Sequence, residues 1–287
     1  MTAHGPVVVL GAGGQVGRAL VQLLGKTAMD VVLAALERIK PSALINAAAY
    51  TLVDKAESEP EAAMQINARG PGALARWAKA RNIPMIHYST DYVFSGTTDA
   101  KTAARPWVET DKTAPINVYG KSKLEGEIRV GAQGGKFLIF RTSWVYDAAG
   151  KNFLNTMLRL GQERQSLKVV DDQVGAPTYA KDLAEATLHA LTKASSHQTF
   201  PSGVYHLTNA GETSWYGFAR EIFEKARALG IPLAVTDLQP IPSSAYPTPA
   251  PRPKNSRLSN AKFKSTFGIE LRPWAPALAE CLHEKSG

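Results

Sequence analysis

Residues 7–17, VVVLGAGGQVG, place a glycine-rich turn directly after a short β-branched run and before an amphipathic stretch that ends near Leu24. The order of strand, glycine turn and helix is typical of the first unit of an open parallel α/β sheet. Gly11, Gly14 and Gly17 allow a tight turn and let backbone N–H groups approach a pyrophosphate at the helix N-terminus. The alternative is a purely structural turn. This context predicts dinucleotide binding near the start of the chain.

The rest of the chain continues as strands alternating with helices. We expect strands over 43–49, 85–89, 137–146 and 168–170, and helices over 60–81, 117–130, 153–160, 179–193 and 213–229. Gly70–Gly72 is a weak point in the first of these helices, and 195–203 reads as a polar loop. The alternation predicts an α/β protein with a Rossmann-type, doubly wound parallel sheet and a smaller C-terminal substrate-binding domain.

Within this organisation, residues 1–150 are predicted to form the NAD(P)-binding domain. Segments near 165–195 and 203–212 are expected to return to it, and 151–287 mainly binds substrate. Residues 240–253, PIPSSAYPTPAPRP, hold six prolines, which exclude a helix or a central strand there. Such a stiff segment suits either a pocket rim or a connection between domains.

Composition narrows the class of protein. The chain has 287 residues, 44% of them hydrophobic and 20% charged, as in soluble globular proteins. No apolar run approaches the roughly 18 residues of a membrane span, and the first residues do not resemble a signal peptide. Cys281 is the only cysteine, which excludes an internal disulfide, and no two of the six histidines have metal-ligand spacing. We therefore expect a cytoplasmic protein with no metal site.

The net charge of +8 is less informative. An excess of basic residues could bind nucleic acid or line a pocket for a diphosphate ligand. It could also be an ordinary basic surface without a binding role. The Lys and Arg residues are scattered, with no block of five or six. Charge alone does not decide between these uses.

Tyr119 and Lys123 form the most suggestive chemical pair. Tyr119 is the only one of nine tyrosines with a Lys four residues later. On a helix these two positions share a face, and a nearby ammonium would lower the pKa of tyrosine toward neutrality. The pair could then donate a proton to a carbonyl that is being reduced. The alternative is a surface Tyr that packs on a Lys stem.

Hydroxyl groups follow the strand predicted over 85–89. Ser89 and Thr90 come where this strand ends, and ligands of open α/β sheets bind at the carboxyl ends of strands. A hydroxyl there can hydrogen-bond a substrate carbonyl. Taken singly, a Ser or Thr at a strand end is more often an ordinary turn or helix cap.

The combination of glycine turn, Asn46 after a buried strand, strand-end hydroxyl and Tyr-x-x-x-Lys is more specific than its parts. With these features the chain resembles the short-chain dehydrogenase/reductase superfamily, in its extended, sugar-nucleotide branch. The matching strings span nearly the whole chain: INAAAYTLVDKAESEPE (45–61), HYSTDYVFSG (87–96), NVYGKSKLEGE (117–127), FRTSWVY (140–146), DDQVGAPT (171–178) and YPTPAPRPKNSRLS (246–259).

The resemblance implies a set of cofactor-binding and catalytic residues. Thr90, Tyr119 and Lys123 would be the catalytic triad: Tyr119 donates the proton, Lys123 tunes it and holds the nicotinamide ribose, and Thr90 polarises the carbonyl. The cofactor, NADPH or NADH, would contact Gly11, Gly14, Gln15, Val16, Gly17, Ala47, Ala48, Ala49 and Tyr50, besides Tyr119 and Lys123.

The resemblance also implies the reaction and the substrate. The 4-keto group of dTDP-4-dehydro-L-rhamnose would be reduced to give dTDP-L-rhamnose, a sugar donor for a cell-surface polysaccharide. Substrate contacts would come from Thr90, Asp91, Trp144, Asn152, Gln173, Arg252 and Arg257. Related dehydratases have Thr-Asp-Glu at the strand end, whereas Tyr92 follows Asp91 here, which argues against elimination chemistry.

Two other functions stay open: an epimerase or dehydratase acting on another sugar nucleotide, and a non-catalytic, cofactor-binding regulatory subunit. No nucleic-acid or membrane partner is expected. A homodimer is possible. The Mg-bridged form that the family implies is doubtful, because the position of its bridging Glu holds Ala19.

Residues 23–41, LLGKTAMDVVLAALERIKP, stand where a second strand should carry a ribose-binding acid. Only 34 residues separate Leu10 from Leu44, whereas two strand–helix units need roughly 50. Val32, Leu36 and Ile39 have helical spacing, so we expect a helix here and reject Glu37 as the ribose ligand. Either the natural polypeptide has a further segment near Lys26–Thr27, or the adenosine half of the cofactor pocket is incomplete.

Overall fold

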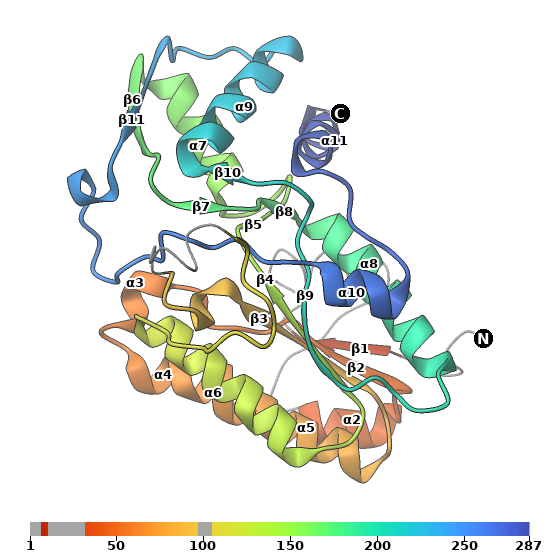
Figure 1. Ribbon diagram of the computed structural model, residues 1–287. Helices are drawn as coiled ribbons and strands as arrows, with labels where there is room; N and C mark the ends of the chain where they lie inside the picture. The colour runs from red at the N-terminus through yellow and green to blue at the C-terminus, as the bar shows by residue number, and fades with distance from the viewer. Residues whose placement is uncertain (1–6, 11–31, 97–104, 287) are drawn as a thin grey trace.

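The computed structural model describes residues 7–10, 32–96 and 105–286 (Figure 1). The glycine turn at Gly11–Gly17, with Gln15 and Val16, lies outside these residues. Ala19 also lies outside them, and so does the position near Lys26–Thr27 where the natural polypeptide could have a further segment. The expectations for these positions therefore stay predictions.

A five-stranded parallel sheet forms the centre of the N-terminal part, in the order β1–β2–β3–β4–β9. Its strands are Val7–Leu10, Ala43–Asn46, Met85–Thr90, Phe137–Thr142 and Gly203–His206. The strands β2, β3 and β4 are buried almost throughout, because helices cover both faces of a parallel sheet. The predicted Rossmann-type α/β fold is confirmed.

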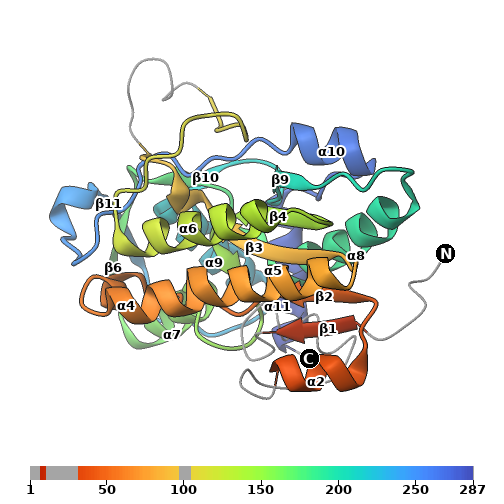
Figure 2. The same ribbon diagram turned by 90° about the horizontal axis from the view of Figure 1, so that it is seen from below.

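Alternation along the strands divides their side chains between two apolar layers. On one face, Leu44, Met85 and Ile139 pack against α2 (Val32–Ile39), α5 (Gly70–Ala80) and α6 (Val118–Gln133). On the other, Ile45, Ile86 and Phe140 pack against α8 (Ala180–Ser196) and α10 (Ala261–Phe267). Figures 1 and 2 show these helices on opposite sides of the sheet.

The stretch predicted as one helix over 60–81 has its irregularity elsewhere than expected. It begins as α4 (Pro60–Met64), passes through one π-helical turn, η1 (Gln65–Arg69), and continues as α5 through the glycines without a break. The short α3 (Val53–Ala56) precedes it. Gly72 is an advantage here, because a Cβ on it would lie only 3.0 Å from the Arg129 side chain of α6.

The C-terminal part has its own apolar core. It is built from α7 (Phe153–Glu163), α9 (Trp215–Ala228), α11 (Trp274–Ser286) and β6 (Ser166–Val170). Three two-stranded sheets complete it: β6 with β11 (Asp237–Ile241), β7 (Val174–Gly175) with β10 (Thr213–Ser214), and β5 (Val145–Tyr146) with β8 (Thr178–Tyr179).

Apart from one short 3-10 turn, the proline-rich segment is not helical, and it forms no central strand, as predicted. Pro240 lies in β11, whose only partner among the described residues is β6, and the one-turn η3 (Ser243–Ala245) follows. The chain then returns to the N-terminal part, where the Asn117 side chain donates to Pro251 O at 2.9 Å. The segment thus connects the two parts and borders the start of α6.

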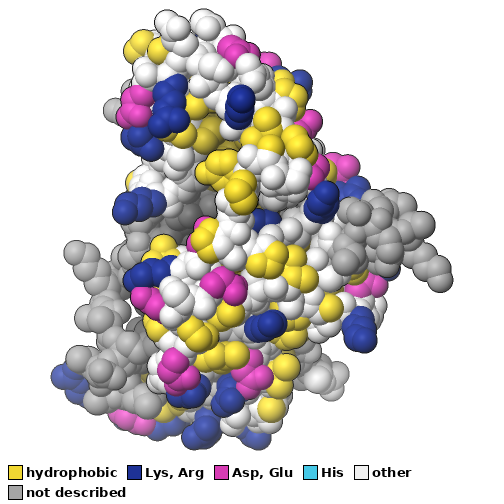
Figure 3. All heavy atoms as spheres, turned by 90° about the vertical axis from the view of Figure 1, so that its left-hand side faces the viewer, with side chains coloured by type: hydrophobic (Ala, Val, Ile, Leu, Met, Phe, Trp, Pro, Cys, Tyr) yellow, Lys and Arg dark blue, Asp and Glu magenta, His cyan; other side chains and the backbone are white. Residues whose placement is uncertain are grey.

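The helix predicted inside 23–41 is present as α2. The Glu37 carboxylate accepts from the Arg81 guanidinium and from the Trp77 indole, so it links α2 to the C-terminal end of α5. Within the described ranges, β1 has a single neighbour, β2. The same ranges contain no helix that could cross a bilayer. On the face drawn in Figure 3, Lys and Arg side chains are interspersed with Asp and Glu, in keeping with their scatter along the sequence.

Candidate active site

The predicted catalytic residues meet where β3 ends and α6 begins. Asn117 caps α6 by accepting from Gly120 N at 2.7 Å, which sets the helix start beside η2 (Asp91–Val93). A Cβ on Gly120 would lie 2.2 Å from Tyr92 O, so glycine allows this close approach. The Tyr119 ring packs edge-on against Tyr92, with centroids 5.7 Å apart. The first turn of α6 therefore presents Tyr119 to the strand end that carries Thr90.

Burial dominates the electrostatics of the two α6 residues. It raises the pKa of Tyr119 to about 12, against the hydrogen-bonding influence of Thr90. This is opposite to the direction that the Tyr-x-x-x-Lys spacing predicts. Burial also lowers the pKa of Lys123 to about 8, while Glu127 acts in the opposite direction. Tyr119 is therefore held as a neutral phenol, a proton donor, at neutral pH.

The structure distinguishes between the two strand-end hydroxyls. Ser89 donates to the Glu127 carboxylate at 2.5 Å and is buried. Thr90 points to the opposite face of the strand, where its hydroxyl contacts Asp91 Oδ1 at 3.1 Å and Tyr92 N at 3.2 Å. Thr90 also interacts with Tyr119, so of the two hydroxyls it is Thr90 that lies beside the predicted proton donor, whereas Ser89 is bound to Glu127.

Asp91 is buried beside this group. The residue is only 2% exposed to solvent, and its Oδ2 atom has no hydrogen-bond partner among the described residues. Burial raises the pKa of Asp91 to about 7, although hydrogen bonding by Ser256 and Thr90 opposes the shift. A carboxyl group next to Thr90 can thus change its protonation state near neutral pH.

Sequence reasoning missed a buried ion pair under the site. Glu127 accepts from Arg141 Nε at 2.9 Å and from Nη2 at 2.6 Å, and both residues are nearly inaccessible to solvent. This bidentate pair ties α6 to β4, and Ser89 ties it to β3. The signal that could have revealed Glu127 is its position one helical turn after Lys123.

Sequence reasoning also missed Asn67, in the π-helical turn. Its side chain accepts from Tyr50 N at 2.8 Å and donates to Tyr50 O at 3.0 Å. It thereby holds Ala47–Tyr50 as an irregular, half-buried segment instead of the extra strand length that we expected. The Tyr50 hydroxyl donates to Glu59 at 2.6 Å.

These residues fit a nicotinamide cofactor. Ala47–Ala49 are partly exposed just beyond the end of β2 and carry no side chain beyond Cβ, which leaves room for a ligand. The ammonium of Lys123 has three N–H donors, one of which is donated to Tyr88 O at 2.5 Å. Lys123 can therefore bind a further oxygen, such as a ribose hydroxyl.

Trp144 lies at the junction of the two parts of the molecule. It follows β4 with a left-handed backbone (φ 48°), which is unusual for a bulky residue and is often found at functional sites. Its indole stacks on Trp215 with ring centroids 3.7 Å apart. Gly175 leaves it room, because a Cβ there would lie 2.8 Å from the indole and 3.1 Å from Ser256. Trp144 is thus close to the Ser256–Asp91 contact.

The remaining predicted substrate residues are partly engaged within the protein. Arg252 pairs with Asp54 at 2.8 Å and influences Tyr92 electrostatically, which places it near the site. Arg257 contacts Asn255 at 3.0 Å and Glu212. Gln173 is buried next to β7. Asn152 caps α7 by accepting from Asn155 N, so its side chain already has a structural role.

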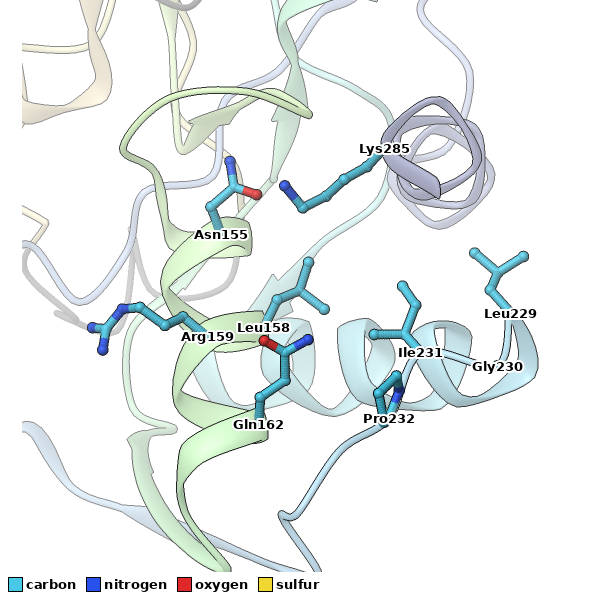
Figure 4. Close-up of a pocket in the computed structure, with 9 residues that line it drawn as sticks. All are labelled: Asn155, Leu158, Arg159, Gln162, Leu229, Gly230, Ile231, Pro232 and Lys285. Atoms are coloured by element: carbon cyan, nitrogen blue, oxygen red, sulfur yellow. The ribbon is translucent and has the colours of Figure 1, made fainter. Parts of the chain in front are cut away.

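A pocket elsewhere contains none of the predicted site residues. It lies between α7, the end of α9 and Lys285 of α11 (Figure 4). Figure 4 shows Lys285 pointing toward Asn155, while Arg159 extends away from the other residues. In the described part of the chain, no group of three or more His, Cys, Asp or Glu side chains could hold a metal ion.

Comparison with known proteins places this geometry in context. The family profile described as RmlD substrate binding domain matches residues 5–286. The dTDP-4-dehydrorhamnose reductase of Burkholderia thailandensis is 48% identical, over 97% of this chain and 98% of that protein. Its alignment runs over 297 positions, ten more than this chain has residues, so the relative contains residues with no counterpart here.

Solved structures agree. A dTDP-4-dehydrorhamnose reductase from Clostridium acetobutylicum superimposes with a TM-score of 0.86 at 38% identity, covering 97% of this chain and 99% of that one. The corresponding reductase of Bacillus anthracis, solved in complex with NADP, also gives 0.86, at 33% identity and with 98% and 99% coverage. Both similarities extend over the N-terminal and the C-terminal parts.

Proposed function

Because the chain belongs to the dTDP-4-dehydrorhamnose reductase family, we propose that it reduces the 4-keto group of dTDP-4-dehydro-L-rhamnose to give dTDP-L-rhamnose. The single observation that best supports this proposal is the meeting of Tyr119, Thr90 and Lys123 at the end of β3. Reduction of a ketone needs a hydride and a proton. A bound NADPH or NADH supplies the hydride, and the protein must supply the proton.

Each residue of the group has a physical task in this proposal. Tyr119, a neutral phenol at neutral pH, donates its proton to the oxygen of the ketone as that oxygen becomes negatively charged. Thr90 donates a hydrogen bond to the same oxygen. Lys123, buried and anchored on Tyr88 O, holds the cofactor ribose and stabilises the tyrosinate that the proton transfer leaves.

The two parts of the chain would divide binding between them. We assign the cofactor to the first 150 residues together with β9 and α8, and the substrate mainly to 151–287. Trp144 and Asp91 would contact the sugar, and Arg252 and Arg257 the diphosphate, through exchange of their present carboxylate partners for phosphate oxygens. Asn152 and Gln173 are proposed to shape the nucleotide end. Such an enzyme would act in the cytoplasm, alone or as a homodimer without bridging Mg.

The first experiment mixes protein, NADPH and dTDP-4-dehydro-L-rhamnose and follows nicotinamide absorbance. Tyr119→Phe is expected to lose about 100-fold or more in turnover, because it removes the proton donor, with little change in NADPH affinity measured by fluorescence. Near-normal turnover of this variant would remove Tyr119 from the mechanism. Decay only with a different keto-sugar nucleotide would redirect the substrate, and product formation without net NADPH consumption would indicate an epimerase or dehydratase.

A further inference from the structure

We propose that Asp91 is the proton reservoir of the site, which reprotonates Tyr119 through the Thr90 hydroxyl after each reduction. This inference rests on the proposed function, in which Tyr119 gives up its proton once per turnover. It assigns to Asp91 a chemical role beyond contact with the sugar.

A continuous polar path supports the relay. Tyr119 interacts with the Thr90 hydroxyl, and Thr90 Oγ1 lies 3.1 Å from Asp91 Oδ1. Asp91, at the end of this path, is 2% exposed. Thr90 interacts with both of the others, and a hydroxyl can accept and donate a proton at the same time.

The second oxygen of Asp91 shows why this carboxyl can store a proton. Oδ2 is buried and has no hydrogen-bond partner among the described residues. An ionised carboxylate with an unpartnered oxygen is costly to bury, whereas a neutral acid is much less so. Burial accordingly raises the pKa of Asp91 to about 7, so that both protonation states are accessible under ordinary conditions.

The groups around Asp91 do not cancel the rise in its pKa that burial causes. Thr90 and Ser256 hydrogen-bond the carboxyl and favour its charged form, but burial outweighs them. Tyr92 and Tyr119 face it from η2 and α6, and the Asp91 charge raises the pKa of both. The two charges of the Arg252–Asp54 pair shift the pKa of Tyr92 in opposite directions: Arg252 lowers it and Asp54 raises it. No cation forms an ion pair with Asp91 among the described residues.

The transfer balances in protons. When Tyr119 has protonated the alkoxide of the product, it remains as a tyrosinate. The Thr90 hydroxyl then gives its proton to the Tyr119 oxygen and takes the proton of the Asp91 carboxylic acid. Asp91 is left as a carboxylate, which takes up one proton from solvent before the next turnover. One proton from solvent is thus consumed for each ketone reduced.

Pre-steady-state kinetics of Asp91→Asn tests the relay. Tyr119 carries its own proton at the start, so in this variant every later turnover should be about 100-fold slower than the first, whatever loss of the sugar contact does to both. NADPH oxidation should therefore show a burst that equals the enzyme concentration. Asp91→Glu, which restores an acid, should regain multiple turnovers, and the exposed Asp237→Asn, on the distant strand β11, should behave like wild type.

Other outcomes overturn the proposal. Equal slowing of first and later turnovers, or a raised KM alone, would make Asp91 a substrate contact, and unchanged kinetics would exclude any role. A second measurement needs neither variant nor cofactor: carbon-13 NMR of aspartate carboxyl groups in the wild-type protein should show one that titrates near pH 7. If every aspartate titrates in the ordinary acidic range, the reservoir is excluded. If wild type fails to oxidise NADPH with this substrate, the proposed function fails, and the NMR result still stands.

Discussion

Removal of one partner of the Glu127–Arg141 pair should strongly destabilise the protein. Both side chains are only 5% exposed, and two N–H···O contacts of 2.9 and 2.6 Å join them. Loss of Glu127 would leave the Arg141 charge buried without its partner, which typically costs about 3–5 kcal/mol. Since 1.4 kcal/mol corresponds to a factor of ten, the folding equilibrium should shift by roughly 100- to 4,000-fold.

The double variant separates pairing from burial. Glu127→Met should cost about 4 kcal/mol, and so should Arg141→Met, but the two together should cost far less than their sum, because the double variant buries no unpaired charge. Urea unfolding, followed by far-UV circular dichroism and by tryptophan fluorescence, gives the free energies. With a slope of about 3 kcal/mol per molar urea, the single variants would lower the midpoint by about 1.3 M.

The exposed pair Arg159–Glu163 on α7 supplies the matched control. Its side chains are 59% and 51% exposed, so Glu163→Gln should cost less than about 0.5 kcal/mol. The reasoning is refuted if Glu127→Met costs no more than this control. It is equally refuted if the two Met substitutions are additive, since the residues would then not act as a pair.

Two further predictions concern stability. Gly126→Ala should lower the free energy of unfolding by about 1–3 kcal/mol, because the new Cβ would lie 2.1 Å from Asn67 O and push α6 away from η1. Gly131→Ala on the same helix is the control: its Cβ would have its nearest neighbour at 4.0 Å, so thermal unfolding should show a neutral or slightly stabilising effect. Burial lowers the pKa of His206 from 6.5 to about 3, so the unfolded chain binds the extra proton below pH 6.5, and stability falls as the pH drops toward 3. Between about pH 6.5 and 5, His206 should lower the free energy of unfolding by about 2 kcal/mol. Denaturant titrations of His206→Gln should show a smaller loss over the same pH range. If the free energy of unfolding depends on pH equally in both proteins, other groups cause the acid sensitivity.

The chain order of the elements could be predicted from sequence because it depends on local patterns. Runs such as Met85–Ser89 and the helical spacing of Val32, Leu36 and Ile39 are read from neighbours along the chain. The pairing of Tyr119 with Lys123 is local too, since four residues on a helix always share a face. These features place a phenol and an ammonium on one side of α6 before any tertiary contact is known.

Tertiary structure alone decided which polar groups are free for chemistry. Ser89 and Thr90 are equivalent in sequence, yet Ser89 is bound by Glu127, which lies 38 residues away, and Thr90 is left to the site. The pKa of Tyr119 rises although its spacing to Lys123 predicts a fall, because desolvation depends on everything packed around a group. The Asp91 carboxyl is hydrogen-bonded by Ser256, which lies far away along the chain. Sequence spacing determines which residues can meet, whereas burial, which sums contributions from the whole fold, determines their protonation.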